Sequence, residues 1–213
     1  MKQRLFATLS LAGLAMSTFG ATKPKTAIKS LNKTTIQQPT YTEWHDLQVN
    51  AINRFPLHTN FFTYPADDWV YEKDGKIVSK DILHMNKTES KYFLSLDGTW
   101  KFNWVANADQ RPTDFYKEDL DDSKWKTMNL PGIWEMNGFG DPEYVNVGFG
   151  WRGHFDQQPP AVPTKDNHVG SYRRIIDIPA NWDGKQVVAH FGSVTSNIYL
   201  YVNGKFAGYA EDS

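Results

Sequence analysis

The second half of the chain alternates apolar and polar residues with the period of a β-strand. Trp100, Phe102 and Trp104 alternate with Lys101 and Asn103, as expected of a strand that buries one face. Similar apolar patterns predict further strands at residues 172–178, 187–191, 197–202 and 205–209. The patterning therefore favours a β-sheet over a helical fold.

Turn signals separate these predicted strands. Asn203-Gly204 stands between two apolar runs and predicts a type I′ hairpin, because both central positions of that turn require a positive φ. Pro112 predicts the start of a short helix at residues 111–117. The sequence shows no strand–helix–strand alternation and no repeat. The predicted class is all-β and antiparallel, a jelly-roll or galactose-binding-like β-sandwich.

One long loop is predicted between these strands, at residues 130–151. It holds seven glycines or prolines and five aromatics in 22 positions, and a loop of that length is usually functional or disordered. Disordered segments are poor in aromatics, so we expect an ordered loop. Its aromatics pack in the core of the sandwich, or they offer flat faces to a sugar ring beside an amide such as Asn146.

Composition limits the classes of function. The 213 residues carry a net charge of −1, so nothing indicates nucleic acid as a partner. Hydrophobic residues make up 40% of the chain, with eight tryptophans, which is enough to build a core of one or two domains. The absence of cysteine excludes disulfides and thiolate metal sites.

Residues 1–21 have the features of a secretory signal peptide. Lys2 and Arg4 precede a short apolar run at residues 5–16, and small residues follow it. The run is too short to span a membrane, and a signal anchor is the alternative interpretation. Together with the absence of cysteine, the segment predicts export to a bacterial periplasm or to the cell exterior.

Other polar clusters carry weaker signals. Glu118, Asp119, Asp121 and Asp122 form either a calcium or acid–base site or a solvated turn, and the order lacks the glycine and terminal glutamate of an EF-hand loop. The histidines show no metal-ligand spacing and are interpreted as surface or loop residues; they are His45, His58, His84, His154, His168 and His190.

Four ordered motifs carry a resemblance to a known family. They are LSLDGTWKFNW at residues 94–104, WE-x-x-G-x-x-x-P-x-Y-x-N-V at 134–147, PPAVPTKDNHVGSYRR at 159–174 and YVNGKFAGYAEDS at 201–213. At this spacing the series resembles the N-terminal sugar-binding domain of the large family 2 β-galactosidases. Upstream, Trp44, Asn53 and Arg54 match a motif of that family's N-terminal arm.

The resemblance and the composition together predict the domain organisation. After the signal peptide, residues 22–42 are a polar flexible spacer. Residues 43–91 would be the extended arm and an insertion with a turn at Asp74-Gly75. Residues 92–213 would be a partial jelly-roll sugar-binding domain, incomplete at its C-terminal end, since five or six strands are predicted where a jelly roll has eight.

The resemblance implies a non-catalytic part of an exported β-galactosidase that hydrolyses terminal β-D-galactosides. Retaining hydrolysis needs two carboxyl groups across the scissile bond, and the family carries both on a later barrel domain. No catalytic residue is therefore assigned here, although Glu135, Glu143 and Glu211 lie in or beside the motifs. The alternatives are a free-standing carbohydrate-binding module, or a β-glucuronidase or β-mannosidase of the same family.

One substrate contact and several partners follow from the same resemblance. Asn146, in Tyr-Val-Asn-Val, matches the asparagine that reaches the galactosyl ring in the family, and an amide can donate and accept hydrogen bonds at once; otherwise it satisfies loop backbone. The family's sodium site is expected outside this chain. The expected partners are a β-galactoside and the remaining domains of a homo-oligomeric enzyme, with no nucleic acid and no membrane.

A structural magnesium site under the arm is also implied. Its matching positions are Glu43, Asp46, the carbonyl of Val49, and Glu211, and oxygen ligands suit a hard cation. The family pattern has Asp, Asn and Gln where this chain has Glu43, Asp46 and Glu211. Three carboxylates would raise the negative charge, which would favour calcium or leave the groups repelling one another.

Overall fold

The computed structural model describes residues 2–12, 37–65, 70–79, 86–142, 161–163 and 165–211. The strands are β1 (Lys2–Ala12), β2 (Ala51–Ile52), β3 (Val70–Lys73), β4 (Lys76–Ser79), β5 (Gly98–Val105), β6 (Lys126–Leu130), β7 (Val169–Asp177), β8 (Thr195–Val202) and β9 (Lys205–Glu211). The helical pieces are single 3₁₀ turns: η1 (Glu43–His45), η3 (Lys87–Glu89), η4 (Ala108–Gln110), η5 (Glu135–Asn137) and η6 (Ala180–Trp182).

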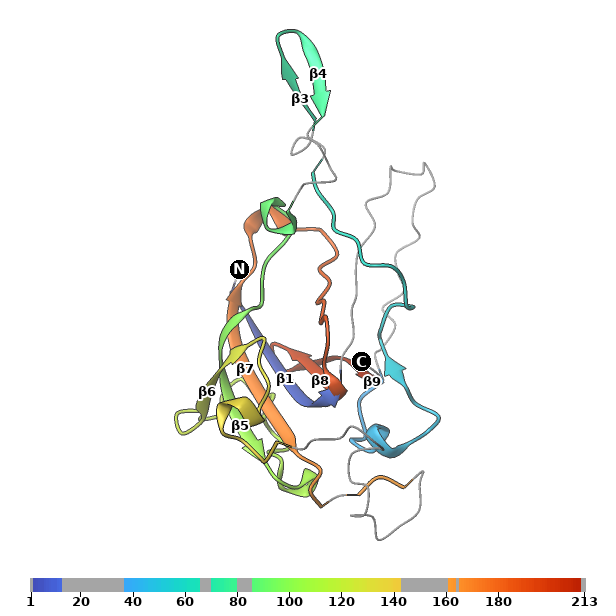
Figure 1. Cartoon of the computed structure of the whole chain (residues 1–213), viewed down its shortest axis with the longest axis vertical. Helices are drawn as coiled ribbons and strands as arrows, with labels where there is room; N and C mark the ends of the chain where they lie inside the picture. Colours follow the sequence, from blue (N-terminus) through green and yellow to red (C-terminus); the bar gives the residue numbers. More distant parts are fainter. Residues whose placement is uncertain are drawn as a thin grey trace.

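Seven strands form one antiparallel sheet in the order β2-β9-β8-β1-β7-β5-β6 (Figure 1). The predicted all-β antiparallel class is confirmed. The other two strands, β3 and β4, pair only with each other, and their hairpin lies away from the main sheet (Figure 1). The described residues thus hold one large sheet and a hairpin, and the jelly-roll arrangement stays a prediction.

The predicted hairpin and the predicted turn in the insertion form where the sequence places them. Asn203 and Gly204 have φ of 49° and 73° and join β8 to β9, and two successive positive φ values fit the type I′ turn. Asp74-Gly75 likewise joins β3 to β4 with positive φ at both positions. Short-range turn chemistry is therefore a sound guide in this chain.

Two predicted elements are wrong. Residues 187–191 form no strand, and Val187 is 49% exposed. This apolar run between glycines therefore does not pair with the sheet. Residues 111–117 form a turn and not a helix. The carbonyls of Phe115 and Lys117 point to the Arg173 guanidinium and accept hydrogen bonds from it.

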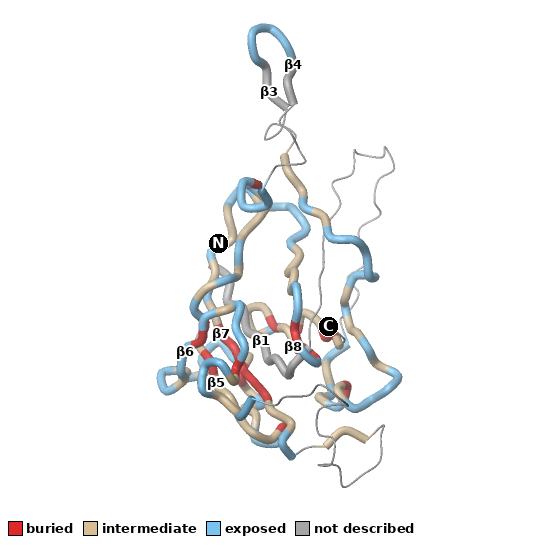
Figure 2. Tube along the Cα trace, viewed as in Figure 1, coloured by how far each residue is buried: buried red, intermediate tan, exposed pale blue. Residues whose placement is uncertain are grey.

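Two buried clusters pack on the main sheet, one around β5, β6 and β7 and the other around β8 and β9 (Figure 2). Around β5, β6 and β7 the buried cluster is Trp100, Phe102, Met128, Trp134 and Tyr172, and Phe102 is fully buried. Gly170 of β7 is required there, because a Cβ would lie 2.8 Å from both the Phe102 and the Trp134 ring. We call this cluster the apolar core.

Around β8 and β9 the opposite face of the sheet carries a second cluster. It consists of Phe115, Tyr199, Tyr201, Phe206 and Tyr209, with Tyr41, Trp44, Val49 and Ile52 of the arm packed against it. We call it the tyrosine core. Three of its five buried members carry a hydroxyl, and each of those hydroxyls takes part in a hydrogen bond, as buried polar groups generally do.

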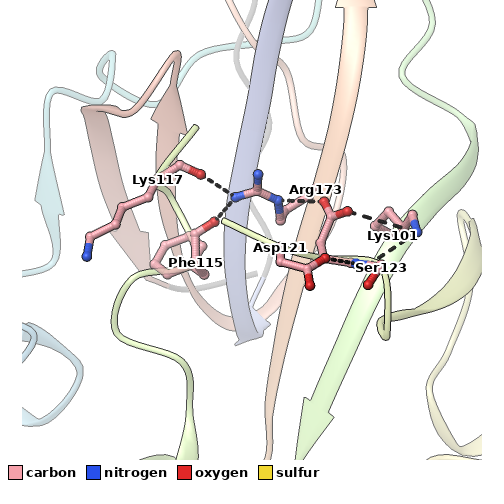
Figure 3. A network of polar contacts seen from close by, with 7 residues as sticks. Lys101, Phe115, Lys117, Asp121, Ser123 and Arg173 are labelled. Atoms are coloured by element: carbon pink, nitrogen blue, oxygen red, sulfur yellow. Dashed lines mark hydrogen bonds and ion pairs between the residues drawn. The ribbon is translucent and has the colours of Figure 1, made fainter. Parts of the chain in front are cut away.

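The segment between β5 and β6 is held against the sheet by hydrogen bonds from one buried arginine of β7. Arg173 of β7 is 5% exposed; its Nε donates to Asp122 at 2.9 Å and its Nη1 donates to the carbonyls of Phe115 and Lys117 (Figure 3). Asp121 accepts from the Ser123 backbone N–H at 3.0 Å. Asp121 thus caps a turn and Asp122 neutralises a buried cation, which favours the turn over the calcium or acid–base interpretation of the cluster.

Candidate functional site

The arm of residues 41–54 lies along the edge of the sheet and is tied to β9. Its strand β2 pairs Ala51 with Ala210. Asn53 donates through its side chain to the carbonyl of Ala207, and Arg54 donates to the carbonyl of Glu211 at 3.1 Å. The Asn-Arg motif therefore acts here as an anchor between the arm and the last strand.

Glu43 of η1 is the buried carboxylate of this junction, with an exposed fraction of 4%. Oε1 accepts from the Thr40 backbone N–H at 2.6 Å and from its hydroxyl at 2.9 Å, and Oε2 accepts from the Tyr199 hydroxyl at 2.8 Å. Burial opposes ionisation most strongly, but the hydrogen bonds from Thr40, from the η1 backbone and from Tyr199 outweigh it and lower the pKa of Glu43. The group is a buried, fully hydrogen-bonded anion.

Glu211 lies on the other side of two packed tyrosines. The Tyr199 and Tyr209 rings have centroids 4.6 Å apart, and the Tyr209 hydroxyl donates to Glu211 Oε1 at 2.7 Å. Burial, followed by the hydrogen bond to its glutamate, raises the pKa of each tyrosine, Tyr199 through Glu43 and Tyr209 through Glu211. Both hydroxyls therefore remain neutral donors at physiological pH.

The remaining two predicted metal positions lie further along the arm. Asp46 is exposed, and its Oδ1 accepts from the Gln48 backbone N–H at 3.0 Å. Val49 packs against the tyrosine core, and its N–H donates to the Asp46 carbonyl at 3.0 Å. Asp46 and Val49 thus take part in the backbone turn that follows η1.

The fit of a hard cation to these positions is poor in this arrangement. Both oxygens of Glu43 accept protein hydrogen bonds, and one oxygen of Glu211 does. Across the described ranges, no three His, Cys, Asp or Glu side chains gather closely enough to hold a metal ion. These carboxylates already accept hydrogen bonds from the two tyrosine hydroxyls, and the magnesium site stays a prediction.

The described part of the long loop supports a core role for two of its aromatics. Trp134 is buried and donates from Nε1 to the Tyr172 hydroxyl, and the Phe139 ring meets Phe102 edge-on at 4.7 Å. Asn146 lies outside the described residues, and so do the loop's three other aromatics. The sugar-facing interpretation of Asn146 therefore stays a prediction.

A shallow pocket lies where the arm meets the sheet. Its lining includes Tyr41, Trp44, Tyr199, Arg111 and Asn197, around a volume of about 20 Å³, room for about one water. Sequence reasoning did not single out Tyr199, Tyr209 or this pocket. The available signal was the alternation of Tyr199 and Tyr201 along one strand opposite Tyr209, which places three hydroxyls on one face.

The geometry first defines a class: an antiparallel β-domain with an extended arm fastened to its last strand. The family model described as "Glycosyl hydrolases family 2, sugar binding domain" matches residues 93–213, more than half of the chain. The chain therefore belongs to glycosyl hydrolase family 2 and contains its sugar-binding domain.

Individual relatives extend the match into the arm. A "Beta-galactosidase" of Halalkalibacterium halodurans is 35% identical over 168 residues, which are 79% of this chain and 15% of that protein. A "Beta-galactosidase" of Lactobacillus delbrueckii subsp. bulgaricus is 36% identical over 79% of this chain and 15% of its own length. A "Beta-galactosidase large subunit" of Leuconostoc lactis is 34% identical, with 26% of its length covered. The chain thus spans only a minor part of these relatives.

Proposed function

We propose that this chain is the non-catalytic sugar-binding part of an exported β-galactosidase, acting on terminal β-D-galactosides together with the remaining domains of that enzyme. The observation that carries the proposal is the match itself: the sugar-binding domain covers residues 93–213, and the β-galactosidase relatives are matched over 15–26% of their lengths. The role proposed for Asn146 is a hydrogen bond to a galactosyl hydroxyl.

Exposed apolar side chains support contact with further domains. Leu47 of the arm is 67% exposed and Leu57, three residues after the arm, is 73% exposed; Ile133 and Met136 of the long loop are 65% and 81% exposed. Single exposed apolar residues are common on proteins, and Ile175 of β7 is 58% exposed as well, but these four are more exposed than it is and lie in two stretches of the chain. Burying them against another domain would supply part of the association energy.

A chimaera tests the proposal. We would replace the matched segment of the Halalkalibacterium halodurans β-galactosidase with this chain and measure hydrolysis of a chromogenic galactoside. The chimaera should be active, the 213-residue chain alone inactive, and Asn146→Ala in the chimaera should lower kcat/KM by about tenfold, the loss expected for one good hydrogen bond. The matched control is Asn137→Ala, whose amide donates to the Ile133 carbonyl within the same loop.

Two results would count against this function. Turnover by the isolated chain would place catalytic carboxylates within it. Calorimetric binding of galactose or lactose by the isolated chain, with no activity in the chimaera, would favour a free-standing carbohydrate-binding module.

Export and the cation are separate parts of the proposal. Export rests on Lys2, Arg4 and the apolar run after them, and a reporter fused after residue 21 should reach the periplasm or medium, while a Lys2→Glu/Arg4→Glu variant should not. None of the helices in the described residues could cross a membrane. The cation rests on the resemblance at Glu43, Asp46, Val49 and Glu211 alone. A rise in Tm with magnesium or calcium that Asp46→Ala abolishes would support it, and the absence of any shift would remove it.

A further inference from the structure

The long loop is fixed on the apolar core by two aromatic side chains near its start. Trp134 is 4% exposed and donates from Nε1 to the Tyr172 hydroxyl. Phe139 meets the Phe102 ring edge-on at a centroid distance of 4.7 Å, and its backbone N–H donates to the Trp134 carbonyl at 3.1 Å. The chain therefore has a defined position and direction when it reaches Gly140.

At Gly140 the loop lies against two further rings, those of Trp104 in β5 and of His168 just before β7. The two rings meet edge to face, with centroids 4.9 Å apart. A Cβ on Gly140 would lie 3.3 Å from Cε1 of His168 and 3.3 Å from Cζ2 of Trp104, and Gly140 has a φ of 74°. Only glycine meets both demands without strain. Because residues 140 and 168 are neighbours in space, both ends of segment 141–167 meet at this point.

The returning end of that segment is held by hydrogen bonds of its own. The backbone N–H of Asp166 donates to Asn107 Oδ1 at 3.0 Å, and the side-chain amide of Asn167 donates to the Pro163 carbonyl at 3.0 Å. The indole N–H of Trp104, by contrast, is buried without a hydrogen-bond partner among the described residues. Because an unpaired buried donor destabilises a fold, packing against its neighbours is what places the Trp104 ring here.

We propose that Trp104, Gly140 and His168 form a loop base, a contact that closes segment 141–167 and positions Asn146 for its sugar hydroxyl. Asn146 lies six residues after Gly140 in the sequence. Tying both ends of a loop lowers the conformational entropy that ligand binding would otherwise have to remove. Trp104 and His168 are then positioning residues that act through the loop. The inference rests on the function proposed above for Asn146.

A double-mutant cycle in the chimaera tests whether the loop base acts through Asn146. His168→Ala should lower kcat/KM for a chromogenic galactoside by about three- to tenfold, and the His168→Ala/Asn146→Ala double variant should be no worse than Asn146→Ala alone. His168→Phe keeps a ring against Trp104 and should restore most of the lost activity. The matched control is His45→Ala, which removes a histidine with a similar contact to the Trp44 ring, at 4.6 Å, but on the arm. It should leave kcat/KM unchanged.

A cleavage measurement tests the contact itself and needs no activity. Trypsin cleavage of the chimaera after Arg152, followed by mass spectrometry, should be at least about threefold faster in His168→Ala and in Gly140→Ala, because cleavage follows the population in which the segment is open. The matched control is Gly138→Ala. Gly138 also has a positive φ, of 82°, but a Cβ there would meet nothing within 4 Å, so this variant carries the backbone strain without the clash.

The outcomes separate this inference from the function on which it rests. Additive losses, a His168→Phe variant no better than His168→Ala, or unchanged cleavage would overturn the loop base, while a loss in Asn146→Ala still supports the sugar contact. Equal cleavage in Gly138→Ala and Gly140→Ala would show that only strain is measured and would also overturn it. An Asn146→Ala chimaera with full activity overturns the sugar contact and the positioning role together.

Discussion

The two halves of the main sheet bury side chains of different chemistry in their cores. Around β7 the apolar core buries rings and a thioether, and it contains one side-chain hydrogen bond between rings, from Trp134 to Tyr172. Around β8 the tyrosine core buries three hydroxyls, and two of them donate to the carboxylates of Glu43 and Glu211. Close packing of side chains dominates the first half. In the second half, buried hydroxyls under the arm are in addition paired with hydrogen-bond acceptors.

Because of this difference, we expect the two halves to contribute differently to stability as the pH changes. Burial of apolar surface does not depend on protonation, so the apolar core should keep its contribution in acid. The pKa of the Glu43 carboxyl is held below its usual value by hydrogen bonds, so its contribution must vanish once it is protonated. The attachment of the arm is thus an acid-sensitive part of the described fold.

The largest effect should come from truncating the centre of the apolar core. Phe102→Ala removes a fully buried ring that contacts Trp134, Phe139 and Tyr172 and should lower the free energy of unfolding by about 3–5 kcal/mol. Urea unfolding measures it, and Phe55→Ala, at a position 36% exposed, is the matched control with a loss under about 1 kcal/mol. A loss below 1 kcal/mol at Phe102 would show that this core is not formed.

The next effect should come from neutralising the buried anion of the tyrosine core. Glu43→Gln keeps the size of the side chain but exchanges one acceptor oxygen for a donor amide, so it breaks a hydrogen bond from Thr40 or Tyr199. We expect a loss of about 2 kcal/mol at pH 7. Glu89→Gln, at an exposed glutamate, should change the free energy of unfolding little.

The pH dependence of that loss sharpens the comparison. Because the folded-state pKa of Glu43 is lowered, its stabilisation is fully present above the ordinary glutamate pKa of about 4.3 and is lost as pH falls through the lower folded value. Wild type and Glu43→Gln should therefore converge in stability below about pH 4, whereas the Phe102→Ala loss should persist. A Glu43→Gln loss that is independent of pH would contradict the buried anion.

Local patterns predicted much of the sheet. The alternation at residues 100–104 and the Asn203-Gly204 turn identified β5 and the β8–β9 hairpin, because these features depend on neighbours in sequence. The strand predicted at residues 187–191 is wrong, because an apolar run does not specify a strand partner. The strand β1 was not predicted, because its apolar run also fits the pattern of an export signal.

The candidate site was less accessible to sequence reasoning. The resemblance placed Glu43 and Glu211 in one implied magnesium site under the arm, but the tyrosines that donate to them come from β8 and β9, more than 150 residues from Glu43. A tyrosine in a strand pattern indicates burial, and nothing local indicates which acceptor its hydroxyl meets. Register between distant segments had to be seen in the structure.

A smaller effect should follow from removing one hydroxyl of the tyrosine core. Tyr209→Phe deletes the donor to Glu211 Oε1 but keeps the ring packed against Tyr199, so we expect a loss of about 1 kcal/mol. Thermal unfolding followed by circular dichroism measures it. Tyr92→Phe, outside both cores, is the matched control and should leave the Tm within about 2 °C. A rise in Tm for Tyr209→Phe would show that this hydroxyl is not satisfied in solution.

The smallest effect should have the opposite sign and arise at a buried position of β7. Ser171 of β7 is fully buried, and its Oγ has no hydrogen-bond partner within the part of the chain that the structure describes. A buried unsatisfied hydroxyl destabilises the fold, so Ser171→Ala should raise the free energy of unfolding by up to about 1 kcal/mol. Thr99→Ala, whose hydroxyl donates to Asn129 at 2.7 Å, should instead lower it slightly. If Ser171→Ala is destabilising, a water or a neighbouring group satisfies the hydroxyl in solution.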